Sequence, residues 1–148
     1  MSTQDYVSQI KHIDHDNETV FNYLSDFSNI SQFINSELLE KLNGKIPRVT
    51  ISDFSSDRDS CRFLVSGQEA GIAIIERQPP KLLKVGSTGS MPLNVTLWIQ
   101  LLPVSPYQTK MRVTLRTEMN VMLKMMFGKK LETGIEQIAD ALTMLPYR

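Results

Sequence analysis

The chain lacks a second cysteine and any apolar run long enough to cross a bilayer. Cys61 is the only cysteine among 148 residues, so no internal disulfide can form. No apolar stretch approaches the roughly twenty residues that a membrane-spanning helix needs. The first residues, MSTQDYVSQ, also lack the basic and then apolar pattern of a secretion signal. These absences predict a soluble, cytoplasmic protein.

An excess of one charge is missing as well. Sixteen Lys and Arg residues balance sixteen Asp and Glu residues, which gives a formal net charge of zero. The charges are spread along the chain, without the basic footprint of a protein that binds nucleic acid or an anionic membrane. A chain of 148 residues can bury a core without disulfides or metals. We therefore expect one domain, 1–148, that has no nucleic-acid partner.

Metal-ligating and catalytic patterns are sparse. His12 and His15 are the two histidines, and their predicted positions in a strand and a turn point them apart, so we expect no metal site. No serine has a histidine partner in the arrangement of a hydrolase triad. Cys61 is expected to be a buried, inert thiol. The sequence predicts no cofactor and identifies no catalytic residue.

Two glutamates keep an enzymatic function open. Glu69 and Glu76 flank an apolar strand, and burial inside a cavity would raise the pKa of either carboxyl and suit it to acid–base catalysis. Solvated glutamates at the ends of a strand are the simpler interpretation. Whether the protein is an enzyme is therefore left undecided, with the balance against it.

The last third of the sequence has the periodicity of one long amphipathic helix, from about 120 to 145. Apolar residues recur there at steps of three and four and share one face: Leu123, Phe127, Leu131, Ile135, Ile138, Leu142 and Leu145. We expect four of them to be buried against a sheet: Leu131, Ile135, Ile138 and Leu142. Four methionines gather where this helix begins, and they suit either ordinary core filling or a flexible pocket wall.

Strand-like segments precede this helix. Alternation of apolar and polar residues predicts strands over 6–13, 49–54, 60–66, 70–77, 81–88, 93–102 and 109–118. Pro79 and Pro80 end the fourth of these because proline cannot donate a backbone hydrogen bond. The last two segments predict an antiparallel hairpin, with Leu97 and Ile99 on its apolar face and Trp98 on its polar face.

Two short helices are expected between the first two strands. Either Asp16 or Asn17 can cap the first helix, which carries Val20, Phe21 and Leu24 at helical spacing. The second helix is expected to turn three apolar residues inward: Ile30, Phe33 and Ile34.

This order of elements resembles the START-like superfamily, which is also called SRPBCC and includes polyketide cyclases, dehydrases and lipid-transport proteins. The segments that carry the resemblance are Val20-Phe21-Asn22-Tyr23-Leu24-Ser25-Asp26-Phe27, Glu76-Arg77-Gln78-Pro79-Pro80-Lys81-Leu82-Leu83 and Thr96-Leu97-Trp98-Ile99-Gln100-Leu101. Small single-domain bacterial members look most similar. The resemblance implies an α+β helix-grip fold, in which a seven-stranded curved antiparallel sheet surrounds the long C-terminal helix and leaves a cavity.

The expected function is the binding of a hydrophobic or amphipathic small molecule in that cavity. Both parities of the segment 70–75 are apolar, and we favour Ile72 and Ile74 as inward. The predicted cavity lining is Phe63, Val65, Ile72, Ile74, Leu97, Ile99, Met111, Val113, Met122, Met126 and Phe127. Two alternatives remain: an enzyme similar to polyketide cyclases or dehydratases, and a co-chaperone-like interaction module with a filled cavity and Trp98 as its contact. Either a monomer or a homodimer fits the sequence.

Overall fold

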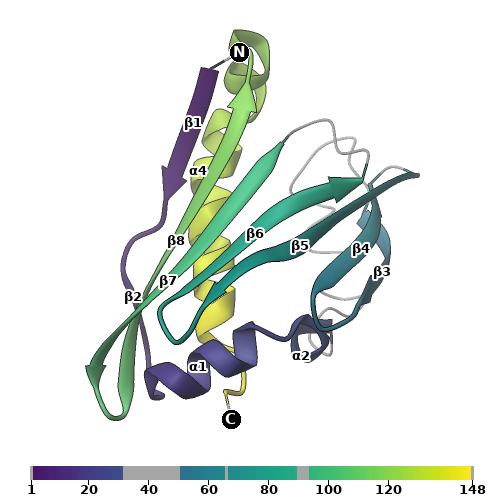
Figure 1. The fold of residues 1–148 in the computed structure, drawn as a ribbon. Coiled ribbons are helices and arrows are strands. Elements are labelled where there is room, and N and C mark those ends of the chain that lie inside the picture. Colours follow the sequence, from purple (N-terminus) through teal and green to yellow (C-terminus); the bar gives the residue numbers. More distant parts are fainter. Residues whose placement is uncertain (1, 32–50, 66, 90–93, 148) are drawn as a thin grey trace.

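The computed structural model describes residues 2–31, 51–65, 67–89 and 94–147. Strands and helices follow one another in the predicted order (Figure 1). The described elements are β1 Ser2–Val7, β2 Lys11–Ile13, α1 Asn17–Leu24, α2 Phe27–Ser31, β3 Ile51–Ser56, β4 Ser60–Val65, β5 Gln68–Gln78, β6 Leu82–Gly89, β7 Val95–Ser105, β8 Gln108–Met119 and α4 Val121–Thr143.

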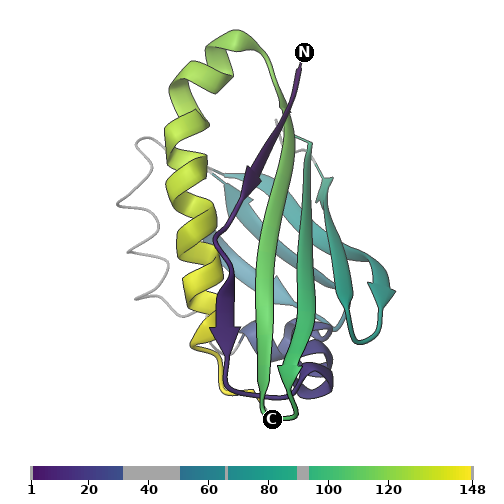
Figure 2. The same ribbon diagram turned by 90° about the vertical axis from the view of Figure 1, so that its left-hand side faces the viewer.

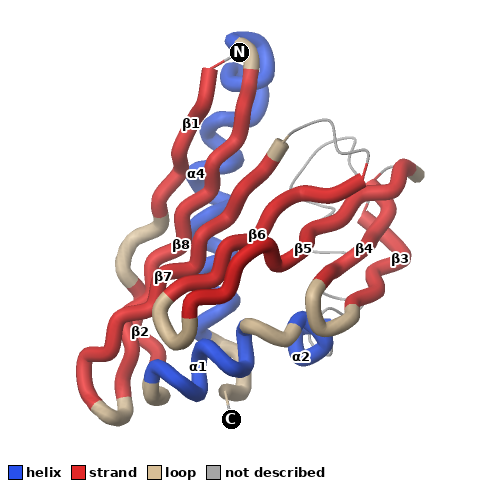
Figure 3. The backbone as a smooth tube through the Cα atoms, in the orientation of Figure 1, coloured by secondary structure: helices blue, strands red, loops and turns tan. Residues whose placement is uncertain are grey.

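All described strands form one antiparallel sheet in the order β1-β8-β7-β6-β5-β4-β3, and β2 also pairs with β8. Figure 3 shows how this sheet twists from one edge to the other, with α1 crossing one end of it. The long helix α4 runs along a single face, where it packs against β8, β1 and β2 (Figure 2). The predicted α+β helix-grip architecture is confirmed.

The first predicted strand is divided into two. β1 ends at Val7 and β2 begins at Lys11. Between them, Ser8 replaces the regular pairing, because its amide donates to the Val113 carbonyl at 2.8 Å while its hydroxyl accepts from the Val113 amide at 3.0 Å. Both halves still lie on β8, so the division leaves the edge of the sheet intact.

The main core lies between one face of the sheet, here called the inner face, and the helices α1 and α4. Side chains alternate between the two faces along β7 and β8, and most of the apolar side chains of these strands point to the inner face, as predicted. The buried residues of α1 pack against them. The core cluster includes Val20, Phe21, Leu24, Leu83, Ile99, Leu101, Met111, Val113, Leu115, Ile135 and Ala139.

Helix α1 begins where the sequence predicts. Asp16 is its N-cap, and its carboxylate accepts a hydrogen bond from the Thr19 amide at 3.1 Å. That bond satisfies one of the amide groups that have no partner inside the helix. The predicted inward side of the second helix falls on Ile30, Phe33 and Ile34, whose side chains lie outside the described residues.

One prediction about α4 is wrong. Ile138 exposes 44% of its surface, whereas its neighbour Ala139 is completely buried together with Ile135. Lys11 explains the rotation, because it forms ion pairs with Glu136 at 2.9 Å and with Asp140 at 3.0 Å. These two acidic residues lie beside the Ile135–Ala139 stripe, on the side away from Ile138. With Glu136 and Asp140 held against β2, Ile138 faces solvent, and Leu131 and Leu142 are half-buried. Among the described helices, none is long and apolar enough to cross a membrane.

Candidate functional site on the inner face of the sheet

Burial of the inner face decreases along the strands. Leu101 and Ile99 of β7 are almost completely buried, but Leu97 and Val95, further from α1, are only half-buried. The same change occurs on β6, where Leu83 is fully buried and the inward Ser87 is half-buried. Helix α1 covers one end of this face (Figure 1), and α4 packs on the strands at one edge. The inner face is therefore least covered at its end on β4 to β7.

A second apolar cluster forms part of this less buried end. Phe27 at the start of α2, Cys61 of β4 and Val85 of β6 are its buried members. Half-buried side chains surround them: Phe54, Ile72, Ile74 and Leu97. Phe63 stacks on Phe54 with ring centroids 6.4 Å apart. This cluster presents aromatic and aliphatic surface, the usual lining of a site for an apolar ligand.

Polar side chains also lie on this part of the inner face, in one row across the strands. The register places Thr117 opposite Val95 and Ser87 opposite Ile72. The Val95 amide donates to the Ser87 hydroxyl at 3.0 Å, which joins the two pairs into one row. The Thr117 hydroxyl is buried and has no hydrogen-bond partner among the described residues. An unpaired buried hydroxyl is costly, so it is a candidate anchor for a polar group of a ligand.

Tyr6 adds a further hydroxyl to the inner face, from β1. It faces inward from β1, because it pairs with the inward Leu115 of β8. Burial raises the pKa of Tyr6, and the Glu132 carboxylate of α4 raises it further. The Tyr6 oxygen lies under Gly128, 3.6 Å from the position that a Cβ would take there. The β1–β8 edge of the inner face is therefore more polar than the β4–β6 side.

The predicted cavity residues separate into four groups. Phe63, Ile72, Ile74 and Leu97 belong to the less buried end, and the register confirms that Ile72 and Ile74 face inward. Ile99, Met111 and Val113 are packed in the main core. Met122 and Met126 lie on the exposed side of α4. The side chains of Val65 and Phe127 are outside the described ones. That these residues line a ligand cavity stays a prediction.

The two glutamates considered for catalysis do not face this site. Glu69 precedes the inward Ala70, so it lies on the outer face. Strict alternation would place Glu76 beside Ile72 and Ile74, but a β-bulge at Ile75 shifts the register and turns Glu76 outward. Neither carboxylate is positioned to transfer a proton on the inner face.

Cys61 is an inward-facing thiol without nucleophilic character. Burial raises its pKa to about 12, and the nearby Asp57 carboxylate contributes to the increase. The thiol is therefore protonated at neutral pH, and only the thiolate is an effective nucleophile. Within the described ranges, no group of three or more His, Cys, Asp or Glu residues is placed to hold a metal ion.

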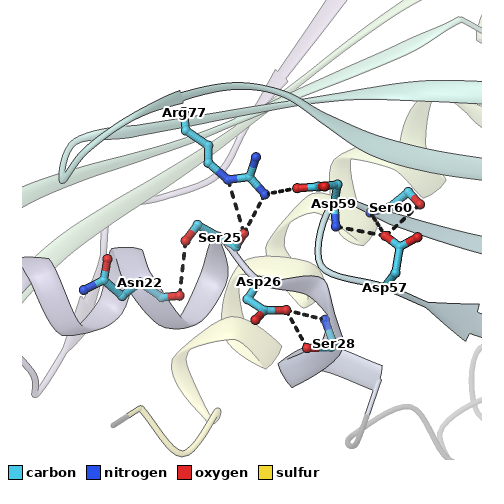
Figure 4. A network of polar contacts seen from close by, with 8 residues as sticks. All are labelled: Asn22, Ser25, Asp26, Ser28, Asp57, Asp59, Ser60 and Arg77. Carbon is cyan, nitrogen blue, oxygen red and sulfur yellow. Dashed lines mark hydrogen bonds and ion pairs between the residues drawn. The ribbon is translucent and has the colours of Figure 1, made fainter.

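The bulge at Ile75 has a further effect, because it turns Arg77 to the inner face. The Arg77 guanidinium donates two hydrogen bonds to the Ser25 carbonyl, at 2.9 and 3.3 Å, and pairs with Asp59 at 2.6 Å (Figure 4). Ser25 and Arg77 belong to two of the segments that carry the sequence resemblance. A second contact involves the start of α1. The side-chain amide of Asn17 donates to the carbonyl of Pro80, in one of these segments, at 2.5 Å. Their role is to fix the α1–α2 turn against the sheet.

Trp98 lies on the outer face of β7, as predicted, but its ring is not a free apolar surface. The Arg116 guanidinium lies 5.0 Å and the Lys84 ammonium 5.7 Å from the ring centroid. Arg116 is itself held by Asp5 at 2.8 Å. These cation–π contacts leave Trp98 half-buried.

The outer face also carries a hollow of about 460 Å³, with both polar and apolar lining, that the sequence did not indicate. Arg62 and Thr88 border it on either side of Gly71, where an added side chain would collide with the Thr88 hydroxyl. Asp53 reaches it from a bulge of β3, where its backbone has a φ of 52°, unusual for a residue other than glycine. The complete lining is Asp53, Ser55, Arg62, Phe63, Leu64, Glu69, Ala70 and Thr88.

Solved structures with the same fold are similar over nearly the whole chain. Norcoclaurine synthase from Thalictrum flavum, in complex with dopamine and hydroxybenzaldehyde, has a TM-score of 0.62 at 12% identity and covers 97% of this chain and 86% of its own. The Mll3558 protein from Rhizobium loti has a TM-score of 0.61 at 16% identity, with coverage of 97% and 98%. CalU16 from Micromonospora echinospora has a TM-score of 0.52 at 15% identity, with coverage of 98% and 86%. No protein-family model and no curated protein matches the chain. At these identities the similarity establishes an SRPBCC-type, helix-grip fold.

Proposed function

We propose that the protein binds a hydrophobic or amphipathic small molecule between the inner face of the sheet and α4. The observation that carries the proposal is the decrease in burial along the inner face, from the filled core at Ile99 to the half-buried Leu97, Val95 and Ile72. A protein that used this face only as core would gain stability by burying these apolar side chains completely. A ligand of mostly carbon surface would complete that burial.

The hydroxyl groups favour an amphipathic ligand over a purely apolar one. Thr117 and Ser87 lie in the same row as Ile72, so one molecule on that row would meet both apolar and polar groups. The Thr117 hydroxyl, unpaired among the described residues, would gain a hydrogen bond from a polar end of the ligand. Norcoclaurine synthase, a protein of the same fold, was crystallised with dopamine and hydroxybenzaldehyde, which are small aromatic molecules with polar substituents.

Catalysis and protein interaction have less support. Glu69 and Glu76 face away from the inner face, and the raised pKa of Cys61 keeps its thiol protonated. Trp98, the contact considered for a protein partner, is occupied by Arg116 and Lys84. We also infer that the protein acts in the cytoplasm, where a single buried cysteine stays reduced.

A pair of tryptophan substitutions on one strand tests the site. Ile72→Trp adds bulk to the inner face, whereas Ile75→Trp adds the same bulk to the outer face, where Ile75 is largely exposed. The probe is the amphipathic dye anilinonaphthalene sulfonate, titrated against each folded protein and followed by fluorescence. We expect Ile72→Trp to lose most of the dye binding and Ile75→Trp to retain it. Equal binding by both variants would contradict a site on the inner face.

A second substitution tests the proposed anchor. Thr117→Val removes the hydroxyl but keeps the shape of the side chain, so the fold is retained or slightly stabilised. Weaker binding of the sulfonate dye together with an unchanged melting temperature would support Thr117 as a ligand contact. Unchanged dye affinity would leave the apolar site in place and remove Thr117 from it.

A further inference from the structure

The first two turns of α4 expose an unusual amount of apolar surface. Val121, Met122, Met125 and Met126 expose 76%, 69%, 82% and 57% of their surfaces. On a helix with 3.6 residues per turn, these four side chains fall within an arc of about 140°. The exposed residues are therefore neighbours on one side of the helix, and we call Val121, Met122, Met125 and Met126 the methionine patch. A contiguous exposed apolar patch is typical of an interaction surface.

Lysines surround the methionine patch. Lys124, Lys129 and Lys130 are exposed on the same two to three turns, and no acidic residue occurs between Glu118 and Glu132. Lys124 and Lys130 border the arc on its two sides, and Lys129 lies within it. The zero net charge of the whole chain conceals this local positive charge. The start of α4 is thus both apolar and cationic, at the end of the molecule where the chain begins (Figure 1).

We propose that the methionine patch and its three lysines dock the protein on an anionic lipid bilayer. A helix that lies in the membrane interface inserts apolar side chains between the lipids and keeps lysines at the level of the headgroups. The long lysine side chain suits this position, because its methylene groups can be buried while its ammonium group stays in water. The cores of protein–protein interfaces, in contrast, are depleted in lysine. Charge complementarity therefore favours a lipid surface as the occupant.

Flotation with lipid vesicles tests this proposal. Vesicles of phosphatidylcholine alone are compared with vesicles that also contain phosphatidylglycerol, at low ionic strength. We expect the wild-type protein to float with the anionic vesicles only, and added salt to release it because salt screens exposed charges. Lys129→Gln and Lys130→Gln should each weaken the binding about fivefold, which corresponds to about 1 kcal/mol per lysine near the membrane surface.

Two exposed methionines, one at the start of α4 and one just after its end, supply a matched pair. Met125→Ser removes the most exposed member of the methionine patch, and Met144→Ser removes a methionine that is 80% exposed in the turn after the opposite end of α4. We expect roughly tenfold weaker vesicle binding for Met125→Ser, from lost insertion of its side chain, and no change for Met144→Ser. Both variants should melt like the wild type, because both side chains are in water.

Three results would overturn the proposal: no flotation of the wild type with anionic vesicles, equal flotation with neutral vesicles, or equal effects of Met125→Ser and Met144→Ser. Self-association that Met125→Ser abolishes, without any vesicle binding, would assign the patch to a second copy of the chain instead. The proposal is independent of the inner-face site. Dye binding by Met125→Ser should equal that of the wild type, so failure of one proposal is distinguishable from failure of the other.

Discussion

Two isoleucines three residues apart on α4 give a sharp test of how this helix is oriented on the sheet. Ile135 is 2% exposed and Ile138 is 44% exposed. Substituting each by alanine removes the same three carbons from the same helix. Any gain in helix propensity, about 0.4 kcal/mol for Ile→Ala, is common to both variants. The difference between them therefore reports burial alone.

The expected magnitudes follow from that burial. Loss of three buried carbons costs about 2.4 kcal/mol at about 0.8 kcal/mol per CH₂ group, and the cavity left at Ile135 raises the total to about 3–4 kcal/mol. For Ile138 roughly half of the transfer contribution remains, about 1.3 kcal/mol, and the gain in helix propensity lowers both figures by the same amount. The two variants should thus differ by about 2 kcal/mol in the free energy of unfolding.

Urea unfolding followed by circular dichroism measures this difference directly. For a domain of this size, about 2 kcal/mol corresponds to a gap of about 4–8 °C in melting temperature, with Ile135→Ala the less stable variant. Equal stabilities, or a less stable Ile138→Ala, would show that the buried stripe of α4 runs through Ile138. The role assigned to Lys11 in rotating the helix would then be refuted.

Three further predictions concern the sheet, the ion pairs and the thiol. Gly71→Ala should destabilise the protein by about 1–3 kcal/mol, because the new Cβ would lie 2.7 Å from the Cys61 carbonyl oxygen; Gly86→Ala should cost less, because its Cβ would meet only the mobile end of Ile75. Equal melting temperatures of the two variants would contradict this contrast. Lys11 lowers the pKa of Glu136 below its ordinary value of 4.5, so the stabilisation is present above that pH and is lost as the pH falls below it. The free energies of unfolding of wild type and Lys11→Met should therefore differ at neutral pH and converge in acid. A difference that grew in acid would contradict this prediction. Cys61 should resist a thiol reagent at neutral pH until the protein is denatured, because its pKa is raised to about 12; rapid labelling of the native protein would show an accessible thiolate.

The architecture could be predicted from the sequence because its signals are local. Alternation on β7 and β8 follows from the pleat, so Leu97, Ile99 and Val113 face inward as expected. Asp16 caps α1 because its short carboxylate can reach the Thr19 amide. Periodicity alone could not decide the facing of Ile72, because both parities of its segment are apolar.

The errors arose where distant residues decide the outcome. Ile138 fits the apolar stripe of α4 as well as Ile135 does, and the rotation depends on distant contacts: the ion pairs of Lys11 with Glu136 and Asp140, and the Gln9 amide that donates to Glu136. The facing of Glu76 depends on a bulge at Ile75, which a regular period-two pattern cannot reveal.

Part of the candidate site was missed even though a signal was present. Thr117 lies on the apolar parity of its strand, in step with Met111, Val113 and Leu115. A threonine in that position is a sign of a polar group on an apolar face, and its lack of a partner among the described residues became evident only from the surrounding structure. The outer hollow gave no such sign, because Gly71 and Asp53 resemble ordinary turn and bulge residues in the sequence.

Native mass spectrometry tests the central claim most directly. The protein is purified without detergent from the cells that normally produce it, and it is compared with Ile72→Trp prepared in the same way. We predict that wild-type protein retains a small organic molecule, which is released on denaturation, and that Ile72→Trp carries little or none of it. Wild-type protein with only the mass of its polypeptide, or the same adduct on both proteins, would contradict binding on the inner face.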